Sequence, residues 1–162
     1  MKTAVIYYSY EGNSALIAEE IRNVLGADLF ELKTEDDTKR EGFSKYFWGG
    51  RQVLTGKSPA LKPCGINVDP YELLIIGFPV WAGSPAPALN SFLGEREIRG
   101  KRIALFCCHG GGKGKALEKL KARLPGNTFA GEIDFRNPLQ QDRGEVTARL
   151  RGWLEALTAP AN

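Results

Sequence analysis

A short polar segment near the start of the chain combines residue types that bind anions. The sequence YSYEGNS places Ser9, Gly12, Asn13 and Ser14 between an apolar run and a stretch with helical spacing. Amide N–H groups in the first turn of a helix lack intrahelical partners, and the helix dipole adds positive charge there. The segment holds no Lys or Arg, so neutral donors would bind a phosphate. Capping of the helix by Asn13 or Ser14 is the alternative interpretation.

Two further segments contain residues suited to a planar ligand. In PVWAGSPAP, Trp81 follows an apolar run directly and is followed by small residues. A tryptophan here either stacks on a planar ring or packs in the core. In HGGGKG, His109 to Gly114, four of six residues are glycine, which allows a ligand to approach the backbone closely.

Each of these segments follows a predicted strand, and strands alternate with helices along the chain. The predicted strands are Thr3–Tyr8, Asp28–Leu32, Glu72–Phe78, Arg102–Cys108 and Thr128–Phe135, and the predicted helices are Asn13–Leu25, Lys115–Leu124 and Gly144–Leu157. This alternation predicts an α/β fold, a doubly wound five-stranded parallel sheet with helices on both faces. In such a sheet, ligands bind beyond the carboxyl ends of the strands, where the three segments would meet.

The composition narrows the class of protein. The 162 residues suit a single domain over residues 1–158, with an insertion at about 35–70. A net charge of +3 with scattered basic residues does not favour a nucleic-acid partner, and no apolar run has the length of a membrane span. With no signal-like start, we expect a cytoplasmic protein. Three cysteines and one histidine indicate neither a disulfide framework nor a zinc site.

The insertion is long for a connection between two strands, and such segments are usually functional. Its apolar residues could form a short helix that is interrupted or ends near Gly49 and Gly50. These residues are Phe43, Tyr46, Phe47, Val53 and Leu54.

The three segments YYSYEGNS, GFPVWAGSPAPAL and LFCCHGGGKGKALEKLKARL together resemble the flavodoxin family. More narrowly, the chain is similar to short bacterial flavodoxin-like proteins whose insertion reads KYFWGG. The resemblance covers nearly the whole chain and implies the strand order 2-1-3-4-5 with noncovalently bound FMN.

The resemblance also implies which residues contact FMN. The phosphate loop would be Ser9, Tyr10, Glu11, Gly12, Asn13 and Ser14. The segment beside the isoalloxazine ring would be Pro79, Val80, Trp81, Ala82, Gly83 and Ser84. The backbone at the polar edge of the ring would come from Cys108, His109, Gly110, Gly111 and Gly112.

Two departures from the family pattern concern the loops. Family phosphate loops often carry Thr where this chain has Glu11, and we expect this carboxylate to point to solvent. The third loop has no aromatic residue except His109, whereas many carrier flavodoxins enclose the ring between two aromatics. Aromatic residues of the insertion, Tyr46, Phe47 or Trp48, would cover the second ring face or pack in a satellite core.

A third departure is charge, because carrier flavodoxins are usually acidic and this chain is slightly basic. If His109 and Lys113 lie near the ring, they would stabilise the reduced flavin and favour two-electron chemistry. The alternative for Lys113 is a solvated surface residue.

Two functions follow from the resemblance. One is an FMN-binding electron-transfer protein that docks onto redox partner proteins. The other is an NAD(P)H-dependent, FMN-containing reductase of quinones or other small acceptors. The chain has no dinucleotide-binding fingerprint of the Gly-x-Gly-x-x-Gly type after a strand, which disfavours the reductase slightly. A hydrolase built on Cys108 and His109 is disfavoured because buried cysteines commonly act as small apolar residues.

Overall fold

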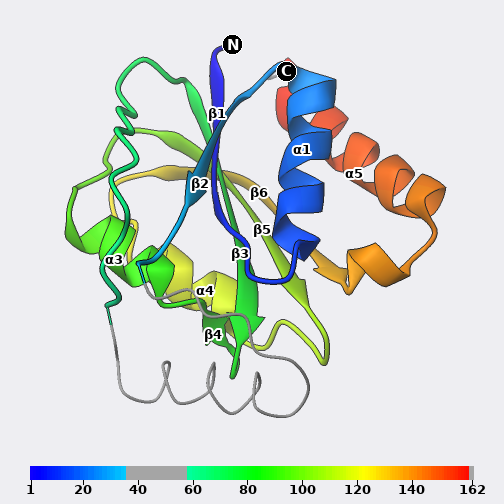
Figure 1. Ribbon diagram of the computed structural model, residues 1–162. Helices are drawn as coiled ribbons and strands as arrows, with labels where there is room; N and C mark the ends of the chain where they lie inside the picture. Colours follow the sequence, from blue (N-terminus) through cyan, green and yellow to red (C-terminus); the bar gives the residue numbers. More distant parts are fainter. Residues whose placement is uncertain (36–57, 161–162) are drawn as a thin grey trace.

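A parallel sheet forms the centre of the molecule, with helices on both faces (Figure 1). The computed structural model describes residues 1–35 and 58–160. The strands are β1 (Thr3–Tyr8), β2 (Asp28–Leu32), β3 (Leu73–Trp81), β4 (Ser84–Pro85), β5 (Arg102–His109) and β6 (Thr128–Arg136). The helices are α1 (Asn13–Leu25), α3 (Ala88–Gly94), α4 (Ala116–Ala122) and α5 (Arg143–Thr158), with a 3-10 turn η1 (Pro138–Gln140).

The strand order confirms the predicted doubly wound topology. The long strands lie in the order β2-β1-β3-β5-β6 and pair in parallel, while the two-residue β4 pairs antiparallel with β3. Without β4, this is the order 2-1-3-4-5. Because the chain moves outward from β1 in both directions, the helices after β1 and β3 leave on opposite faces of the sheet.

The two faces of the sheet carry separate apolar cores. On one face, β-strand side chains pack with α1 and α5, including Ile17, Ile21 and Leu150. On the other face, strand side chains pack with α3 and α4, including Phe92 and Leu117. β1 is buried along its whole length, as its continuous apolar sequence predicts for a strand covered on both sides.

A glycine in the middle of β3 makes room for an aromatic side chain of β5. Gly77 pairs with Phe106 in the parallel register. A Cβ atom added at Gly77 would lie 1.9 Å from Cζ of Phe106, which is fully buried. The Phe106 ring therefore occupies the space that a side chain at position 77 would need.

Most predicted elements are present, with shifts at their ends. Strands β3 and β5 extend past their predicted carboxyl ends, and α4 is shorter than the predicted helix from Lys115 to Leu124. Gly26 ends α1 in a left-handed conformation, as expected of a glycine after a helix. The sequence analysis missed α3, β4 and η1, because seven, two and three residues are too few for a clear periodic pattern.

The described ends of the insertion lie side by side. Thr34 and Leu61 form an antiparallel bridge, and Glu35 N–H donates to the Ala60 carbonyl at 2.9 Å. The chain therefore leaves the end of β2 and returns to the same place. The predicted short helix, with the aromatic residues 43, 46, 47 and 48, lies outside the described residues.

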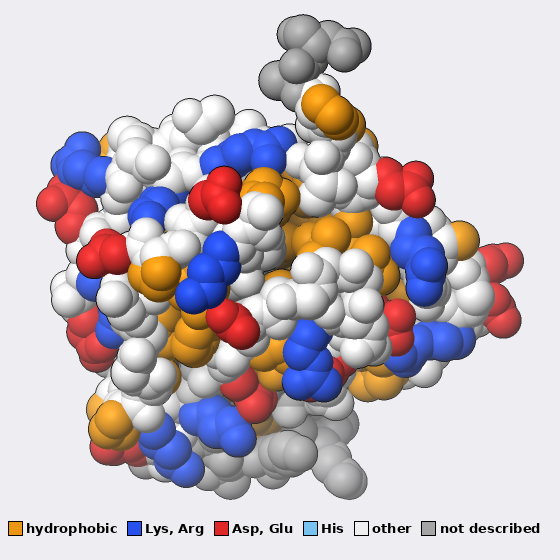
Figure 2. All heavy atoms as spheres, turned by 90° about the horizontal axis from the view of Figure 1, so that it is seen from above, with side chains coloured by type: hydrophobic (Ala, Val, Ile, Leu, Met, Phe, Trp, Pro, Cys, Tyr) orange, Lys and Arg blue, Asp and Glu red, His pale blue; other side chains and the backbone are white. Residues whose placement is uncertain are grey.

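The face that carries both chain ends shows Lys and Arg side chains interspersed with Asp and Glu (Figure 2). Such mixing is typical of a solvated surface rather than of a basic field for nucleic acid. In residues 1–35 and 58–160, no helix combines the length and apolar character that crossing a bilayer requires.

Candidate functional site

A pocket opens at the carboxyl ends of β1, β3 and β5, where the predicted loops meet. It encloses about 680 Å³ when the part open to solvent is included. The lining residues are Ser9, Tyr10, Glu11, Asn13, Ser14, Pro79, Val80, Trp81, Ala82, Cys108, His109, Gly110 and Asn137. All but Asn137 belong to the set that the resemblance to flavodoxins implies.

The first turn of α1 leaves two amide groups without a partner at this pocket. Gly12 precedes the helix with φ of 106°, a left-handed conformation that glycine adopts at little cost. The Ser9 hydroxyl accepts a hydrogen bond from the Ala15 amide at 3.1 Å. Within the described parts of the chain, the amide N–H groups of Asn13 and Ser14 bond to nothing. Unpaired amides at a helix N-terminus bind anions.

The Ser14 side chain adds a buried polar atom to the same place. Ser14 is 1% exposed, and its hydroxyl oxygen has no well-formed hydrogen bond to any residue that the structure describes. A buried hydroxyl without a partner costs free energy unless a ligand supplies one. Ser14 therefore fits an anion bound at the start of α1.

Helix capping by Asn13 or Ser14, the alternative interpretation of this loop, is wrong. Gly12 is the N-cap residue and has no side chain, and the side chain that does bond a first-turn amide of α1 is that of Ser9, not of Asn13 or Ser14. The Asn13 side chain instead accepts a hydrogen bond from the Leu139 amide at 3.0 Å, which ties the loop to η1. The Asn13 side chain thus holds η1 in place, whereas the Ser14 side chain lines the pocket.

The aromatic ring of Trp81 forms another part of the pocket wall. The Trp81 ring lies edge-to-face with Tyr8, with centroids 5.8 Å apart, and with Tyr10, with centroids 5.7 Å apart. Both tyrosines are buried. Such pairs hold a ring in a defined orientation, so Trp81 presents a fixed apolar surface to the pocket.

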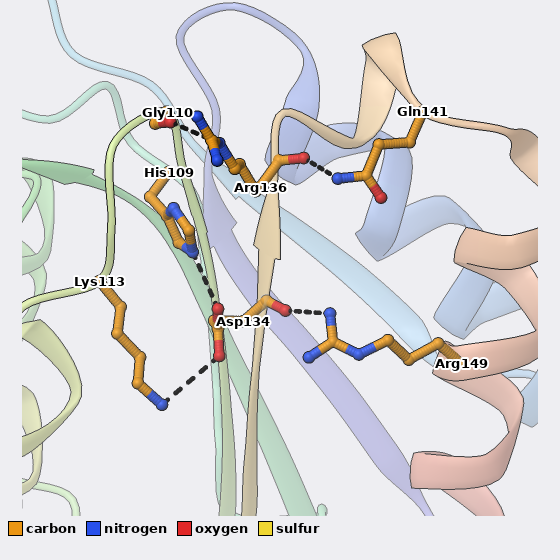
Figure 3. A network of polar contacts seen from close by, with 7 residues as sticks. All are labelled: His109, Gly110, Lys113, Asp134, Arg136, Gln141 and Arg149. Atoms are coloured by element: carbon orange, nitrogen blue, oxygen red, sulfur yellow. Dashed lines mark hydrogen bonds and ion pairs between the residues drawn. The ribbon is translucent and has the colours of Figure 1, made fainter.

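The third loop is fastened to β6 by polar contacts (Figure 3). The His109 ring nitrogen Nε2 lies 2.8 Å from Oδ2 of Asp134, and Lys113 Nζ lies 3.4 Å from Oδ1 of the same carboxylate. Arg136 donates from Nε to the Gly110 carbonyl at 3.0 Å. Asp134 therefore pairs with both His109 and Lys113, and its negative charge offsets part of the positive charge of this loop.

The two adjacent cysteines of β5 are buried and free. Their side chains belong to different cores, Cys107 on the α3 and α4 side and Cys108 on the α1 and α5 side. Burial raises the pKa of each thiol to about 12, although the Ser14 hydroxyl acts in the opposite direction on Cys108. Thiols with such a pKa are poor nucleophiles near neutral pH, which agrees with the interpretation that disfavoured a hydrolase.

Five predicted contact residues lie outside the pocket lining. They are Ser84 and four glycines, Gly12, Gly83, Gly111 and Gly112, and three of these glycines have positive φ. These glycines shape the turns rather than the wall of the pocket. Glu11 is an exposed residue of the pocket lining.

The sequence analysis missed two residues at the end of β6. Asn137 lines the pocket with φ of 41°, and its amide donates to the His109 carbonyl at 2.9 Å. Asp134 lies behind His109. The Asn-Pro pair after the last strand was the available signal for a turn at this edge.

The comparison with known families decides the classification. The flavodoxin model matches residues 2–143. The chain belongs to the flavodoxin family. Within this flavodoxin-family chain, the three loops of the pocket all fall in the matched range. No curated protein matches the chain.

Solved structures share the fold of this flavodoxin-family protein. A protein from Bacteroides eggerthii, classed as a flavoprotein, has a TM-score of 0.78 and 22% identity, covering 98% of this chain and 99% of the other. A flavoprotein from Lactobacillus acidophilus, solved in complex with FMN, has a TM-score of 0.69 and 26% identity, covering 86% and 95%. An NADPH-quinone reductase from P. pentosaceus has a TM-score of 0.63 and 11% identity, covering 99% and 100%.

Proposed function

We propose that this protein binds FMN noncovalently in the pocket and transfers electrons to or from redox partner proteins. One observation carries the proposal: the pocket joins an anion site to an aromatic wall. The anion site consists of the Asn13 and Ser14 amides with the Ser14 hydroxyl. The aromatic wall is Trp81, held by two buried tyrosines. A flavin phosphate needs the first feature and an isoalloxazine ring needs the second.

The donors present fit the phosphate of FMN. The amides and hydroxyl at the start of α1 are neutral, and the helix dipole supplies the favourable potential. FMN, when bound, would supply the ability to accept and give electrons. The protein residues would hold the phosphate, orient the ring against Trp81 and place the backbone of Cys108 to Gly110 beside it.

The relative from Lactobacillus acidophilus supports this cofactor, because it shares the fold and binds FMN. The pocket also lies where doubly wound sheets place their ligands, at the carboxyl edge beside the strand where the order reverses. The three free cysteines agree with a reducing compartment, and we propose a cytoplasmic location.

The first test is a calorimetric titration of the apoprotein with FMN, riboflavin and inorganic phosphate. We expect one molecule of FMN to bind per chain, and riboflavin to bind more weakly because it lacks the phosphate. Replacement Ser14→Ala should weaken FMN binding about tenfold or more, as expected for one hydrogen bond to a charged group. The same variant should leave the affinity for riboflavin unchanged.

A second buried serine gives the matched control. Ser91 is 8% exposed and donates to the Pro59 carbonyl, away from the pocket. Ser91→Ala should leave FMN binding at the wild-type value. Equal losses in both variants would mean that burial of a serine, and not phosphate binding, explains the effect. Absence of FMN binding to the wild type would overturn the proposal.

The alternative function is a reductase of quinones or similar small acceptors with NAD(P)H as donor. Lys113 in the third loop and Arg136, which bonds to that loop, favour it because cationic side chains stabilise a reduced, anionic flavin, although Asp134 offsets part of the Lys113 charge. An anaerobic reductive titration of the FMN-loaded protein separates the two. A long-wavelength absorbance band at half reduction supports the one-electron carrier. Direct bleaching, with rapid turnover by NADH or NADPH and a quinone, supports the reductase.

A further inference from the structure

Three basic side chains converge on the end of β6 behind the pocket wall (Figure 3). Lys113 pairs with the Asp134 carboxylate, Arg136 donates to the Gly110 carbonyl, and Arg149 of α5 donates to the Asp134 carbonyl at 2.7 Å. Asp134 is the acidic side chain that pairs with Lys113 and with His109, which lines the pocket. Its negative charge therefore offsets the positive charge of Lys113 beside the pocket.

Asp134 uses both carboxylate oxygens in this network. Oδ2 contacts Nε2 of His109, and Oδ1 contacts Nζ of Lys113. Burial raises the pKa of Asp134, but the His109 hydrogen bond and the Lys113 charge outweigh burial and hold it below its ordinary value. The side chain is therefore ionised at neutral pH. Glu11 is the acidic residue in the pocket lining.

We propose that Asp134 sets the electrostatic potential at the ring end of the pocket and so tunes the reduction potential of the bound flavin. This inference rests on the proposed FMN binding. Asp134 is a positioning residue: it acts by orienting His109, which lines the pocket, and by cancelling the charge of Lys113. It takes no part in electron transfer itself.

The physical basis is the charge that the ring gains on reduction. Two electrons from a donor such as dithionite, with one proton from water, leave the ring with one additional negative charge. A carboxylate behind His109 opposes that charge, and Lys113 favours it. Removing the carboxylate alone should therefore stabilise reduced FMN relative to oxidised FMN. Because both groups are partly exposed, the effect is moderate and decreases with salt.

The first variant is Asp134→Asn, whose amide oxygen can still accept the hydrogen bond from His109. We expect the ratio of oxidised to reduced FMN dissociation constants to rise about fivefold. For a two-electron step this equals a potential more positive by about 20 mV. The measurement is anaerobic dithionite reduction of the loaded protein in equilibrium with a reference dye of known potential.

The matched control is Glu132→Gln on the same strand. Glu132 pairs with Lys121 at 2.8 Å, a similar ion pair that lies outside the pocket lining. This variant should leave the potential unchanged. An equal shift in both variants would overturn the assignment to Asp134, because it would show a general effect of net charge.

Two further variants separate charge from structure. Lys113→Met alone should make the potential more negative, since the carboxylate is then unopposed. The double variant Asp134→Asn with Lys113→Met restores the local net charge, and its potential should return to the wild-type value. If the reduction potential of the double variant instead differs from the wild-type value by more than that of either single variant, the proposal fails. The contacts of Asp134 would then serve only to hold the structure together.

Failure of the cofactor assignment would look different. If the wild type does not bind FMN, no potential can be measured and the proposed function falls first. If the wild type and all four variants bind FMN with the same potential, FMN binding stands and the role of Asp134 is overturned.

Discussion

At the residue scale, Asn137 combines a left-handed backbone with a side chain that makes no hydrogen bond to the described residues. Its φ of 41° lies in the left-handed region, which Asn tolerates better than most residues. Its amide and carbonyl make backbone hydrogen bonds, to His109 and Gln140, whereas its carboxamide bonds to no described residue. Residues kept in such conformations often contact ligands.

We expect Asn137→Gly to weaken FMN binding about fivefold, the value of one ordinary hydrogen bond. Glycine keeps the left-handed backbone, so the stability of the apoprotein should change by less than about 1 kcal/mol. Titration calorimetry and urea denaturation give the two quantities. The exposed neighbour Gln140→Ala is the control, and equal FMN affinity in both variants would contradict a contact by the carboxamide.

Glu11 offers a second prediction at this scale. A carboxylate at the rim of the anion site repels a phosphate dianion, so Glu11→Thr should tighten FMN binding two- to threefold at low salt. Riboflavin affinity should stay constant, since riboflavin carries no phosphate. Glu11→Gln separates the loss of charge from the change of shape. A large loss of affinity in Glu11→Thr would show that the Glu11 side chain supports the loop.

At the element scale, α5 depends on one capping residue. The Asp142 carboxylate accepts a hydrogen bond from the Glu145 amide at 3.0 Å, at the start of the helix. Asp142→Ala should lower the free energy of unfolding by about 1 kcal/mol. The pocket should keep its FMN affinity, because Asp142 is absent from its lining. Urea denaturation tests the first expectation and titration calorimetry the second.

A substitution at the other end of the same helix is the control. Thr158 donates from its hydroxyl to the Leu154 carbonyl in the last turn. Thr158→Ala should lower the free energy of unfolding by less than Asp142→Ala does. The reason is that the carbonyl groups that Thr158 contacts already accept backbone hydrogen bonds. Equal decreases in the free energy of unfolding would mean that the Asp142 cap stabilises α5 no more than an ordinary side-chain hydrogen bond does.

The elements differ in how well the sequence predicts them. Strands β1, β3 and β5 are predicted because their apolar runs match burial on both faces of the sheet. α3 is missed because a seven-residue helix that starts after Pro87 shows hardly two turns of periodicity. The ends of β3 and β5 extend into residues that resemble loop sequence, since these residues pair with neighbours that only the fold supplies.

At the scale of the whole molecule, burial of three ionisable groups predicts alkaline sensitivity. Burial raises the pKa of Tyr7, Cys107 and Cys108 to about 12, from 10.0 for the tyrosine and 9.0 for the thiols. The unfolded chain loses these protons first. The stabilisation by the neutral groups is therefore complete below pH 9 and is lost as pH rises towards 12.

Urea denaturation at intervals between pH 8 and 11 should show a free energy of unfolding that falls with pH. Cys107→Ala should reduce the slope, because one of the buried thiols is removed. If the free energy of unfolding of this variant falls with pH as steeply as that of the wild type, groups other than Cys107 cause the loss of stability at alkaline pH. Iodoacetamide should leave Cys107 and Cys108 unmodified at pH 8 in the folded protein, as expected for buried, protonated thiols.

The site was predictable where local sequence determines it. The loop before α1 and the glycines after β5 carry turn residues directly after predicted strands, so their position at this edge of the sheet follows from the sequence. Asp134 and Asn137 were not predictable in this way. They resemble ordinary surface residues until the sheet places β6 beside β5, with Arg136 opposite His109 and Asp134 opposite Cys107.

The close contact between Gly77 and the Phe106 ring also limits how this sequence can change over time. A side chain at position 77 is tolerated only when position 106 becomes smaller, and a smaller residue at 106 leaves a void that a larger residue at 77 can fill. Neither change is neutral by itself. Among descendants of this chain, the two positions should therefore vary as a pair or not at all.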